Sequence, residues 1–147
     1  MHIIDMKGFK AVGLPVQGDW QTLPEVMPEK WDEFYKNSIN IKNRVKEGYM
    51  DICLSEVDGI YTQFICAEVS EFDEVPEGFM CQEIPEGKYL HYTHTVRVEE
   101  IYASFEEMYS FAEAHGHKVT GFKIDYGYEE GGTESEHELY IRVIEER

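Results

Sequence analysis

The spacing of hydrophobic residues predicts a strand and then a helix near the N-terminus. The apolar segment Phe9–Val16 is typical of a strand, which Pro15 and Gly18 bring to an end. Further along, large side chains recur at the three-then-four spacing of one buried helix face. This stripe comprises Trp31, Phe34, Tyr35 and Ser38, and Ile41 and Val45 extend it.

The boundaries of this helix are predicted from capping residues. Thr22-Leu23-Pro24-Glu25 has the Thr-x-x-Glu form of a capping box, and Pro28 is acceptable at a first helical position. We therefore expect the helix to begin between Leu23 and Pro28. Gly48 is the residue expected to end it.

A hairpin and a long loop follow. The runs Met50–Glu56 and Ile60–Val69 are separated by a short segment that contains Asp58-Gly59. Asp-Gly between two alternating segments is a strong hairpin signal, because both residues accept the turn's positive φ angles. The segment Ser70–Gly78 is rich in Glu, Pro and Gly and is expected to be a connecting loop.

The second half of the chain repeats the order of elements found in the first. We expect strands over Phe79–Ile84, Lys88–Thr95, Val119–Tyr128 and Glu136–Ile144, with a polar loop containing Gly131-Gly132 before the last. A helix lies between the second and third of these. Its apolar stripe is Ile101, Phe105, Met108 and Ala112, and Gly116 stands where a C-terminal cap belongs.

The sequence therefore predicts one α+β domain over residues 1–147, built as a duplicated β-α-β-β unit. The segment Trp31–Tyr35 occupies the place in the first unit that Phe105–Tyr109 occupies in the second, and the repeats cover about 6–69 and 79–145. Two such units would form an antiparallel sheet with two helices on one face. A crevice is expected along the pseudo-twofold axis between them.

The last strand carries the candidate chemistry. Leu139 and Ile141 share one face of the strand, so Glu138 and Tyr140 project side by side from the other. A carboxylate beside aromatic rings suits a bulky apolar cation, through charge attraction and contact with the ring faces. The alternative is an ordinary exposed polar face, and Arg142 on that face favours it.

Composition limits the classes of partner. With 42% hydrophobic residues the chain is globular, and its net charge of −17 argues against direct binding of nucleic acid, which needs clustered Lys and Arg. The acidity is explained by attraction for cationic ligands, by mimicry of nucleic acid, or by solubility alone. We expect no membrane span, because no run approaches the required apolar length, and a cytoplasmic location, because no signal-peptide pattern is present and the three cysteines are scattered.

The sequence predicts neither a metal site nor a cofactor. His91 and His94 are three residues apart on an expected strand, so they point to opposite faces and cannot chelate one ion. His115 and His117 flank Gly116, where interaction with a helix end is the ordinary role. The chain contains no Cys-x-x-Cys motif, no phosphate-binding glycine loop and no nucleophile elbow.

Three stretches resemble the GyrI-like small-molecule-binding domain, also called the bacterial transcription-activator effector-binding domain. Val75–Phe79 with Ile84–Tyr89 is similar to that family's paired turn into its central strand. The helix start at Trp31 and the closing Glu138–Ile141 are similar to its first helix and last strand. The chain departs from the family at Arg142, where proline is usual, and near Val96, where a glycine often follows the central strand.

The resemblance implies a duplicated β-α-β-β (SHS2-like) fold whose crevice takes lipophilic, often cationic compounds. In relatives fused to DNA-binding domains, ligand occupancy controls transcription. By analogy, Glu138 would meet the ligand's positive charge, with Tyr140 beside it. The wall residues that we expect, chosen for their size, are Trp31, Tyr61, Phe64, Tyr92 and Tyr126.

The resemblance leaves two other functions open. Some members of the family are hydrolases that open strained rings in reactive natural products, and Glu138 with Tyr140 or Tyr126 would be the catalytic pair here. Alternatively, the acidic domain would inhibit a DNA-binding enzyme such as a topoisomerase. For the binding function, the partner besides the ligand would be a separate transcription regulator.

Overall fold

The computed structural model describes residues 1–95, 97–130 and 136–144, and it is an α+β fold with a single antiparallel sheet. Eight strands are hydrogen-bonded in the order β1-β6-β8-β7-β3-β4-β2-β5. The strands are β1 (His2–Met6), β2 (Phe9–Gly18), β3 (Tyr49–Val57), β4 (Ile60–Val69), β5 (Met80–Ile84), β6 (Gly87–His94), β7 (Val119–Tyr128) and β8 (His137–Val143). Two α-helices are α1 (Leu23–Ser38) and α2 (Ile101–Ala114), with a short 3-10 helix (Val98–Glu100) before α2.

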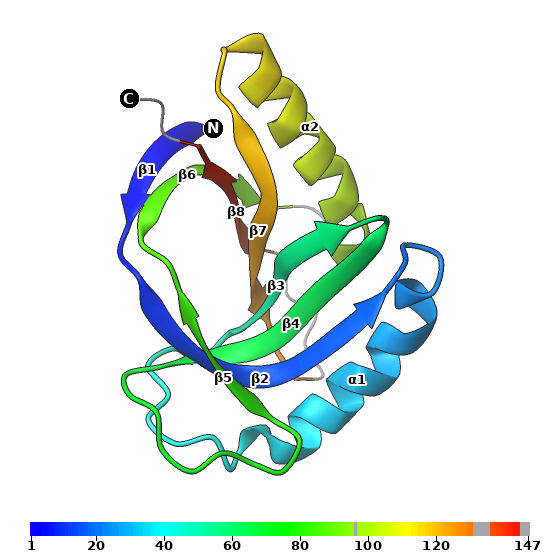
Figure 1. The fold of residues 1–147 in the computed structure, drawn as a ribbon, viewed down its shortest axis with the longest axis vertical. Coiled ribbons are helices and arrows are strands. Elements are labelled where there is room, and N and C mark those ends of the chain that lie inside the picture. The colour runs from blue at the N-terminus through cyan, green and yellow to red at the C-terminus, as the bar shows by residue number, and fades with distance from the viewer. Residues whose placement is uncertain (96, 131–135, 145–147) are drawn as a thin grey trace.

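The sheet curls strongly, and both helices lie on its outer side (Figure 1). The units β2-α1-β3-β4 and β6-α2-β7-β8 meet where β3 pairs with β7. In this central pair Asp51 lies directly opposite Asp125. The fold class predicted from the sequence is therefore confirmed, with two helices on one face of an antiparallel sheet.

The helices are held by apolar residues that project from alternate positions of the strands beneath them. Under α1, Phe34 packs with Leu14 of β2 and Ile65 of β4 in one buried cluster. Under α2, Met108 packs with Leu139 in a second cluster, separate from the first. Each fully buried side chain of this size contributes about 1.5–3 kcal/mol, so these stripes determine where the helices dock.

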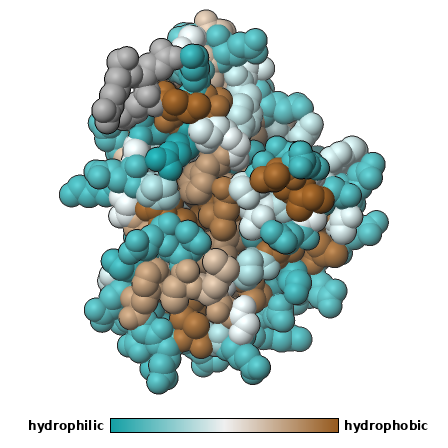
Figure 2. Space-filling model, viewed as in Figure 1, coloured by the Kyte–Doolittle hydropathy of each residue, from teal (hydrophilic) through white to brown (hydrophobic). Residues whose placement is uncertain are grey.

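The inner face of the curled sheet carries a third cluster, which no helix covers. Phe64, Ile52 and Tyr89 are almost completely buried there, together with Ile124. In Figure 2 the brown and tan atoms in the middle of the molecule lie on its surface, so the fully buried members of the cluster are not among them, and most of the periphery is teal. The curvature of the sheet thus buries the inner face against itself.

Helix α1 begins at Leu23, within the predicted range Leu23–Pro28, but its cap differs from the sequence prediction and it ends ten residues before Gly48, the predicted end. The helix ends at Ser38, so Ile41 and Val45 do not extend it; Val45 instead follows Arg44, which bridges to β4. The capping box is also absent, since Thr22 makes no side-chain hydrogen bond as N-cap. Instead, the Asp19 carboxylate accepts a hydrogen bond from the backbone N–H of Thr22 at 2.7 Å. Asp19 therefore accepts from the Thr22 N–H, the group that the capping box would pair with the Glu25 side chain, while the Glu25 N–H donates to the Thr22 carbonyl.

Several local predictions agree with the structure. Asp58 and Gly59 have φ angles of 53° and 81°, as a tight hairpin turn requires. Gly116 ends α2 with a φ angle of 73°. Strand β1 was not predicted from the sequence. The predictions about Val96 and Gly131-Gly132 lie outside the described residues.

The described helices include none that is both long enough and apolar enough to span a membrane.

Candidate ligand-binding site

A groove of about 470 Å³ runs between the start of α1 and the length of α2, on the face of the sheet that carries both helices. Its lining comes from both units of the fold and from the central strands. The residues are Trp20, Leu23, Pro24, Met27, Asp51, Tyr61, Gln63, Tyr102, Phe105, Glu106, Tyr109 and Lys123. This position corresponds to the crevice that the duplicated fold was expected to form.

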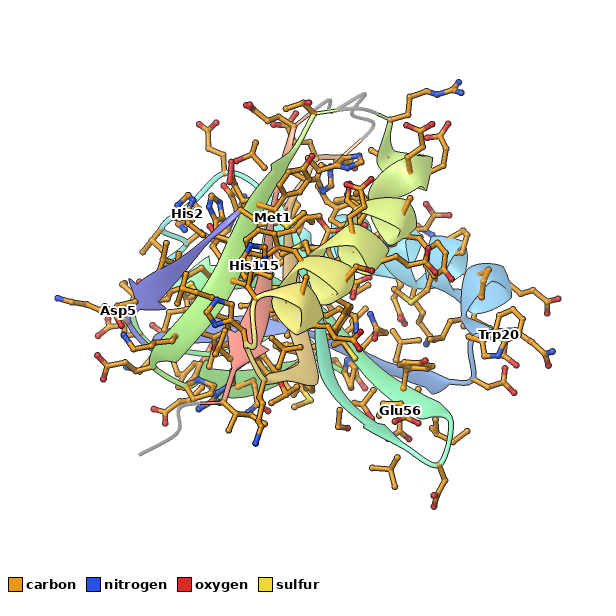
Figure 3. The ribbon with its side chains drawn as sticks, turned by 90° about the horizontal axis from the view of Figure 1, so that it is seen from above. Met1, His2, Asp5, Trp20, Glu56 and His115 are labelled. Atoms are coloured by element: carbon orange, nitrogen blue, oxygen red, sulfur yellow. The ribbon has the colours of Figure 1, made fainter. Side chains whose placement is uncertain are left out.

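The walls of the groove are mainly apolar and aromatic. Leu23 and Met27 face it from the first turns of α1, and Phe105 and Tyr109 face it from one side of α2. At the mouth, Trp20 is 69% exposed and Tyr102 is 73% exposed. Figure 3 shows Trp20 in the loop before α1, on the opposite side of the molecule from His2 and Asp5. Two large, exposed aromatic rings beside a groove favour a binding surface.

The floor of the groove holds one partly buried carboxylate. Asp51 projects from β3 into the groove and accepts a 2.8 Å hydrogen bond from the side-chain amide of Gln63. Burial raises the pKa of Asp51 to about 7, and the neighbouring charge of Asp125 adds to the rise. The hydrogen bond from Gln63 and the charge of Lys123 oppose it. A carboxyl group that titrates near neutrality at the base of a groove is typical of a functional site.

The equivalent carboxylate of the second unit, Asp125, is buried and bonded to its neighbours. When the two units are aligned in sequence so that Phe105 matches Trp31, Asp125 matches Asp51 and His137 matches Gln63. Asp125 is 5% exposed and is bonded to His137 Nδ1 at 2.5 Å and to the Tyr128 hydroxyl at 2.7 Å. These contacts fill the space around Asp125. Only the Asp51 half of the pseudo-symmetric pair opens onto the groove.

The groove also contains a positive charge. Lys123 Nζ lies 5.3 Å from the ring centroid of Tyr109 and 5.9 Å from that of Phe105, on the α2 side. The second acidic residue in the lining, Glu106, accepts a hydrogen bond from the exposed Tyr102. The groove therefore offers aromatic faces together with charges of both signs.

The predicted site residue Glu138 lies on the inner face of the sheet and not in this groove. Its carboxylate is bonded to His91 Nε2 at 2.5 Å and to the Thr93 hydroxyl at 2.9 Å. Arg142, which follows on the same face of the strand, borders a different hollow beside Gly87 and Lys88. The neighbours of Glu138 are thus an imidazole and a hydroxyl rather than a guanidinium.

Tyr140 and Tyr126 share the inner face with Glu138. Both line a smaller hollow of about 230 Å³, where Lys46 Nζ lies 5.1 Å from the Tyr126 ring centroid. Burial, followed by the charge of Glu138, raises the pKa of Tyr140. Glu138 does not line this hollow. The structure therefore brings Tyr126 and Tyr140 together in one hollow, and the Glu138 carboxylate lies outside that hollow.

The remaining predicted wall residues are separated by the sheet. Phe64 is fully buried in the inner-face cluster. Trp31, a residue of α1, packs on Tyr128 of β7, with ring centroids 4.7 Å apart. Tyr92 packs in the cluster under α2. Tyr61 alone of the predicted residues lines the groove between the helices. The seven predicted residues consequently do not form one pocket.

Asp51 was missed because its strand looked like an ordinary hairpin strand. The signal was available in the duplication, since aligning the two units superposes Asp51 on Asp125 within otherwise hydrophobic strands. Two acids at equivalent positions of a central strand pair face the same side of the sheet. Choosing residues by size favoured buried aromatics, which are usually core.

His91 and His94 point to opposite faces of β6, as the sequence predicted. His94 is buried on the helix-bearing face, where it is bonded to Ser104, and His91 lies on the inner face. His115 contacts the carbonyl of Phe111 at the end of α2. Among the described residues, no group of three or more His, Cys, Asp or Glu side chains could hold a metal ion.

Comparison with known proteins places these features in a family. The Cass2 family, described as integron-associated effector binding protein, matches residues 2–143. No curated protein matches the chain.

Solved structures with the same fold cover nearly the whole chain. SAV2435 bound to tetraphenylphosphonium is similar with a TM-score of 0.74 and 12% identity, covering 97% of this chain and 93% of that one. The EcmrR C-terminal domain has a TM-score of 0.68 and 13% identity, with coverages of 97% and 96%. A hydrolase from Listeria innocua has a TM-score of 0.65 and 12% identity, with coverages of 97% and 91%. At these identities the likeness establishes the fold.

Proposed function

The chain belongs to the Cass2 family of integron-associated effector binding proteins, and from this we propose that it binds a lipophilic organic cation in the groove between α1 and α2. Asp51 would face the positive charge, and the aromatic walls would surround the apolar groups. Occupancy would either sequester the compound or report it to a separate transcription regulator.

The observation that carries the proposal is the Asp51 carboxylate at the floor of an aromatic groove. A neutral apolar ligand would gain nothing from this buried acid, because the acid must stay desolvated beneath it. An organic cation gains both charge attraction and contact with ring faces such as those of Trp20 and Tyr61. The volume of about 470 Å³ is within the range of small-molecule sites.

Asp51 suits this role better than Glu138. The Glu138 carboxylate already accepts hydrogen bonds from Thr93 and contacts His91 Nε2. A ligand cation at Glu138 would have to compete with the imidazole for the same oxygen atom. Among the described residues, Asp51 accepts one hydrogen bond, from the neutral amide of Gln63, so its carboxylate keeps lone pairs for a ligand.

Hydrolysis is the second candidate function, and the titration of Asp51 favours it. A carboxyl group with a pKa of about 7 can donate or accept a proton at neutral pH. The same groove would then hold a reactive substrate. Asp51 would be the catalytic group, in place of the pair of Glu138 and a tyrosine that the sequence suggested. Product formation during the binding experiment would separate catalysis from binding.

Titration of two aryl phosphorus compounds that differ in charge tests the proposal. Tetraphenylphosphonium and neutral triphenylphosphine oxide have similar aryl groups, so calorimetric titration of each compares binding with and without a positive charge. We expect the phosphonium to bind at least about tenfold more tightly. Equal affinity for the two compounds, or no binding of either, would contradict a cation site.

A further inference from the structure

Lys123 is part of the groove wall and is held there by weak contacts. Its ammonium group donates to the Tyr109 hydroxyl at 3.3 Å and to the Gly121 carbonyl at 3.4 Å, both neutral acceptors at long distance. The Tyr109 hydroxyl itself donates to the carbonyl of Thr120, which leaves its oxygen free to accept from Lys123. These contacts fix the position of the ammonium without neutralising its charge.

No carboxylate compensates this charge at close range. Within the described ranges, no Asp or Glu oxygen lies within 4.0 Å of Lys123 Nζ, whereas Lys30, Lys46 and Lys88 each pair with an acidic side chain. Lys123 is also only partly exposed, so water screens it less than a surface lysine. A cation of this kind at the side of a groove is a binding point for an anion.

The two opposite charges of the groove are placed close to each other. Lys123 pairs with Cys53 across β3 and β7, so Asp51, two residues along the strand, is its diagonal neighbour on the same face. Diagonal neighbours across a strand pair are roughly 7–8 Å apart. One small ligand can therefore contact both groups.

The lysine also changes which ring faces are available. Its ammonium occupies the faces of Phe105 and Tyr109 on the α2 side of the groove. A ligand cation would be repelled from that wall and directed toward Asp51 and the rings of Trp20 and Tyr61. The groove is consequently polarised, with its negative group at the floor and its positive group on the α2 wall.

We propose that the groove selects zwitterionic lipophilic ligands, which carry an anionic group such as a carboxylate on the same molecule as the cation. The anion pairs with Lys123 while the cation lies over Asp51. This inference rests on the proposed function and specifies its ligand class. It differs from a simple cation site because a ligand without the anion leaves the lysine without a close acidic partner.

Matched phosphonium probes test the selectivity. Butyltriphenylphosphonium and (4-carboxybutyl)triphenylphosphonium differ in the terminal carboxylate, which is ionised at pH 8. We expect the wild-type protein to bind the carboxylated probe about tenfold more tightly, in line with a charge-assisted hydrogen bond. Lys123→Met should abolish this preference, and Lys123→Arg should retain most of it.

The outcomes separate this inference from the proposed function. Binding of butyltriphenylphosphonium without any preference for the carboxylated probe overturns the role of Lys123 and leaves the cation site intact. A preference that persists in Lys123→Met overturns it equally. If neither probe binds the wild-type protein, the proposed cation site fails and this inference fails with it. Circular dichroism of both variants verifies that they are folded.

Discussion

Asp51 and Asp125 lie directly opposite each other on the two central strands, and each is bonded to the equivalent residue of the following strand. Like charges facing each other across a strand pair are destabilising. The protein tolerates them because Asp125 is compensated by His137 and Tyr128, while Asp51 has its pKa raised to about 7. Asp125 is thereby enclosed by its partners, whereas Asp51 lines the groove between the helices.

The pH dependence of cation binding follows from this difference. A ligand with a permanent positive charge favours the ionised form of Asp51, so affinity should rise with pH until about pH 7 and then level off. Below pH 7 we expect the dissociation constant of tetraphenylphosphonium to increase by up to about tenfold per pH unit. Calorimetry from pH 5.5 to 8.5 measures this profile. The profile of Asp51→Asn should be flat, and a wild-type profile that is also flat would contradict the role of Asp51.

The same carboxyl group should make folding stability depend on pH in the opposite sense to a salt-bridged acid. Its pKa is raised from 3.8 in the unfolded chain to about 7 in the fold, so its contribution is present below pH 4 and is lost as the pH rises to 7. Relative to the wild type, Asp51→Asn should therefore be more stable at pH 8, by at most about 4 kcal/mol. Urea unfolding at pH 8 and pH 5 measures the difference, which should shrink at the lower pH. A variant that is less stable at pH 8 would contradict this assignment.

Tryptophan fluorescence should report the groove through Trp20 only. The chain has two tryptophans, and Trp20 lines the groove while Trp31 of α1 packs on Tyr128. We expect a bound phosphonium to change the emission of the wild type and of Trp31→Phe. Trp20→Phe should bind the probe with little spectral change. A signal that survives in Trp20→Phe and disappears in Trp31→Phe would move the ligand away from the groove.

The packing of β2 against β4 should depend on a glycine. A Cβ atom at Gly13 would lie 2.0 Å from the Ile65 carbonyl oxygen and 2.6 Å from the Cα of Cys66, both backbone atoms that cannot move aside alone. Gly13→Ala should lower the free energy of unfolding by about 3 kcal/mol or prevent folding. Gly121→Ala is the matched control in β7, because a Cβ atom there meets nothing within 4 Å. Similar stabilities for the two variants would contradict the described packing.

The fold could be predicted from the sequence because its evidence is local. The Asp58-Gly59 turn, the stripe of α2 and the cap at Gly116 each depend on neighbouring residues, and all three agree with the structure. Strand β1 could not be found in this way, since its pairing partner in β6 is far along the chain. The end of α1 was misplaced because periodicity continues past Ser38 into a segment that pairs with β4.

The candidate site was harder to predict, because it depends on which face of the sheet each residue occupies. Alternation correctly separated Glu138 and Tyr140 from Leu139, but it could not assign the helices to one of the two faces. The helices cover the Leu139 face, which leaves Glu138 on the inner side. Aligning the two units in sequence pairs Asp51 with Asp125, but only the register of β3 and β7 shows that the two acids lie opposite each other on the helix-bearing face.

The most direct test of the account compares two acid-to-amide variants in one titration. Tetraphenylphosphonium should be titrated at pH 8 into the wild type, Asp51→Asn and Glu138→Gln, with circular dichroism as a check of folding. We expect Asp51→Asn to weaken binding by at least about tenfold, as the loss of a partly buried charge contact requires. Glu138→Gln, the matched control on the other face of the sheet, should stay within about twofold of the wild type. Unchanged affinity in Asp51→Asn, with a large loss in Glu138→Gln, would contradict the groove as the binding site.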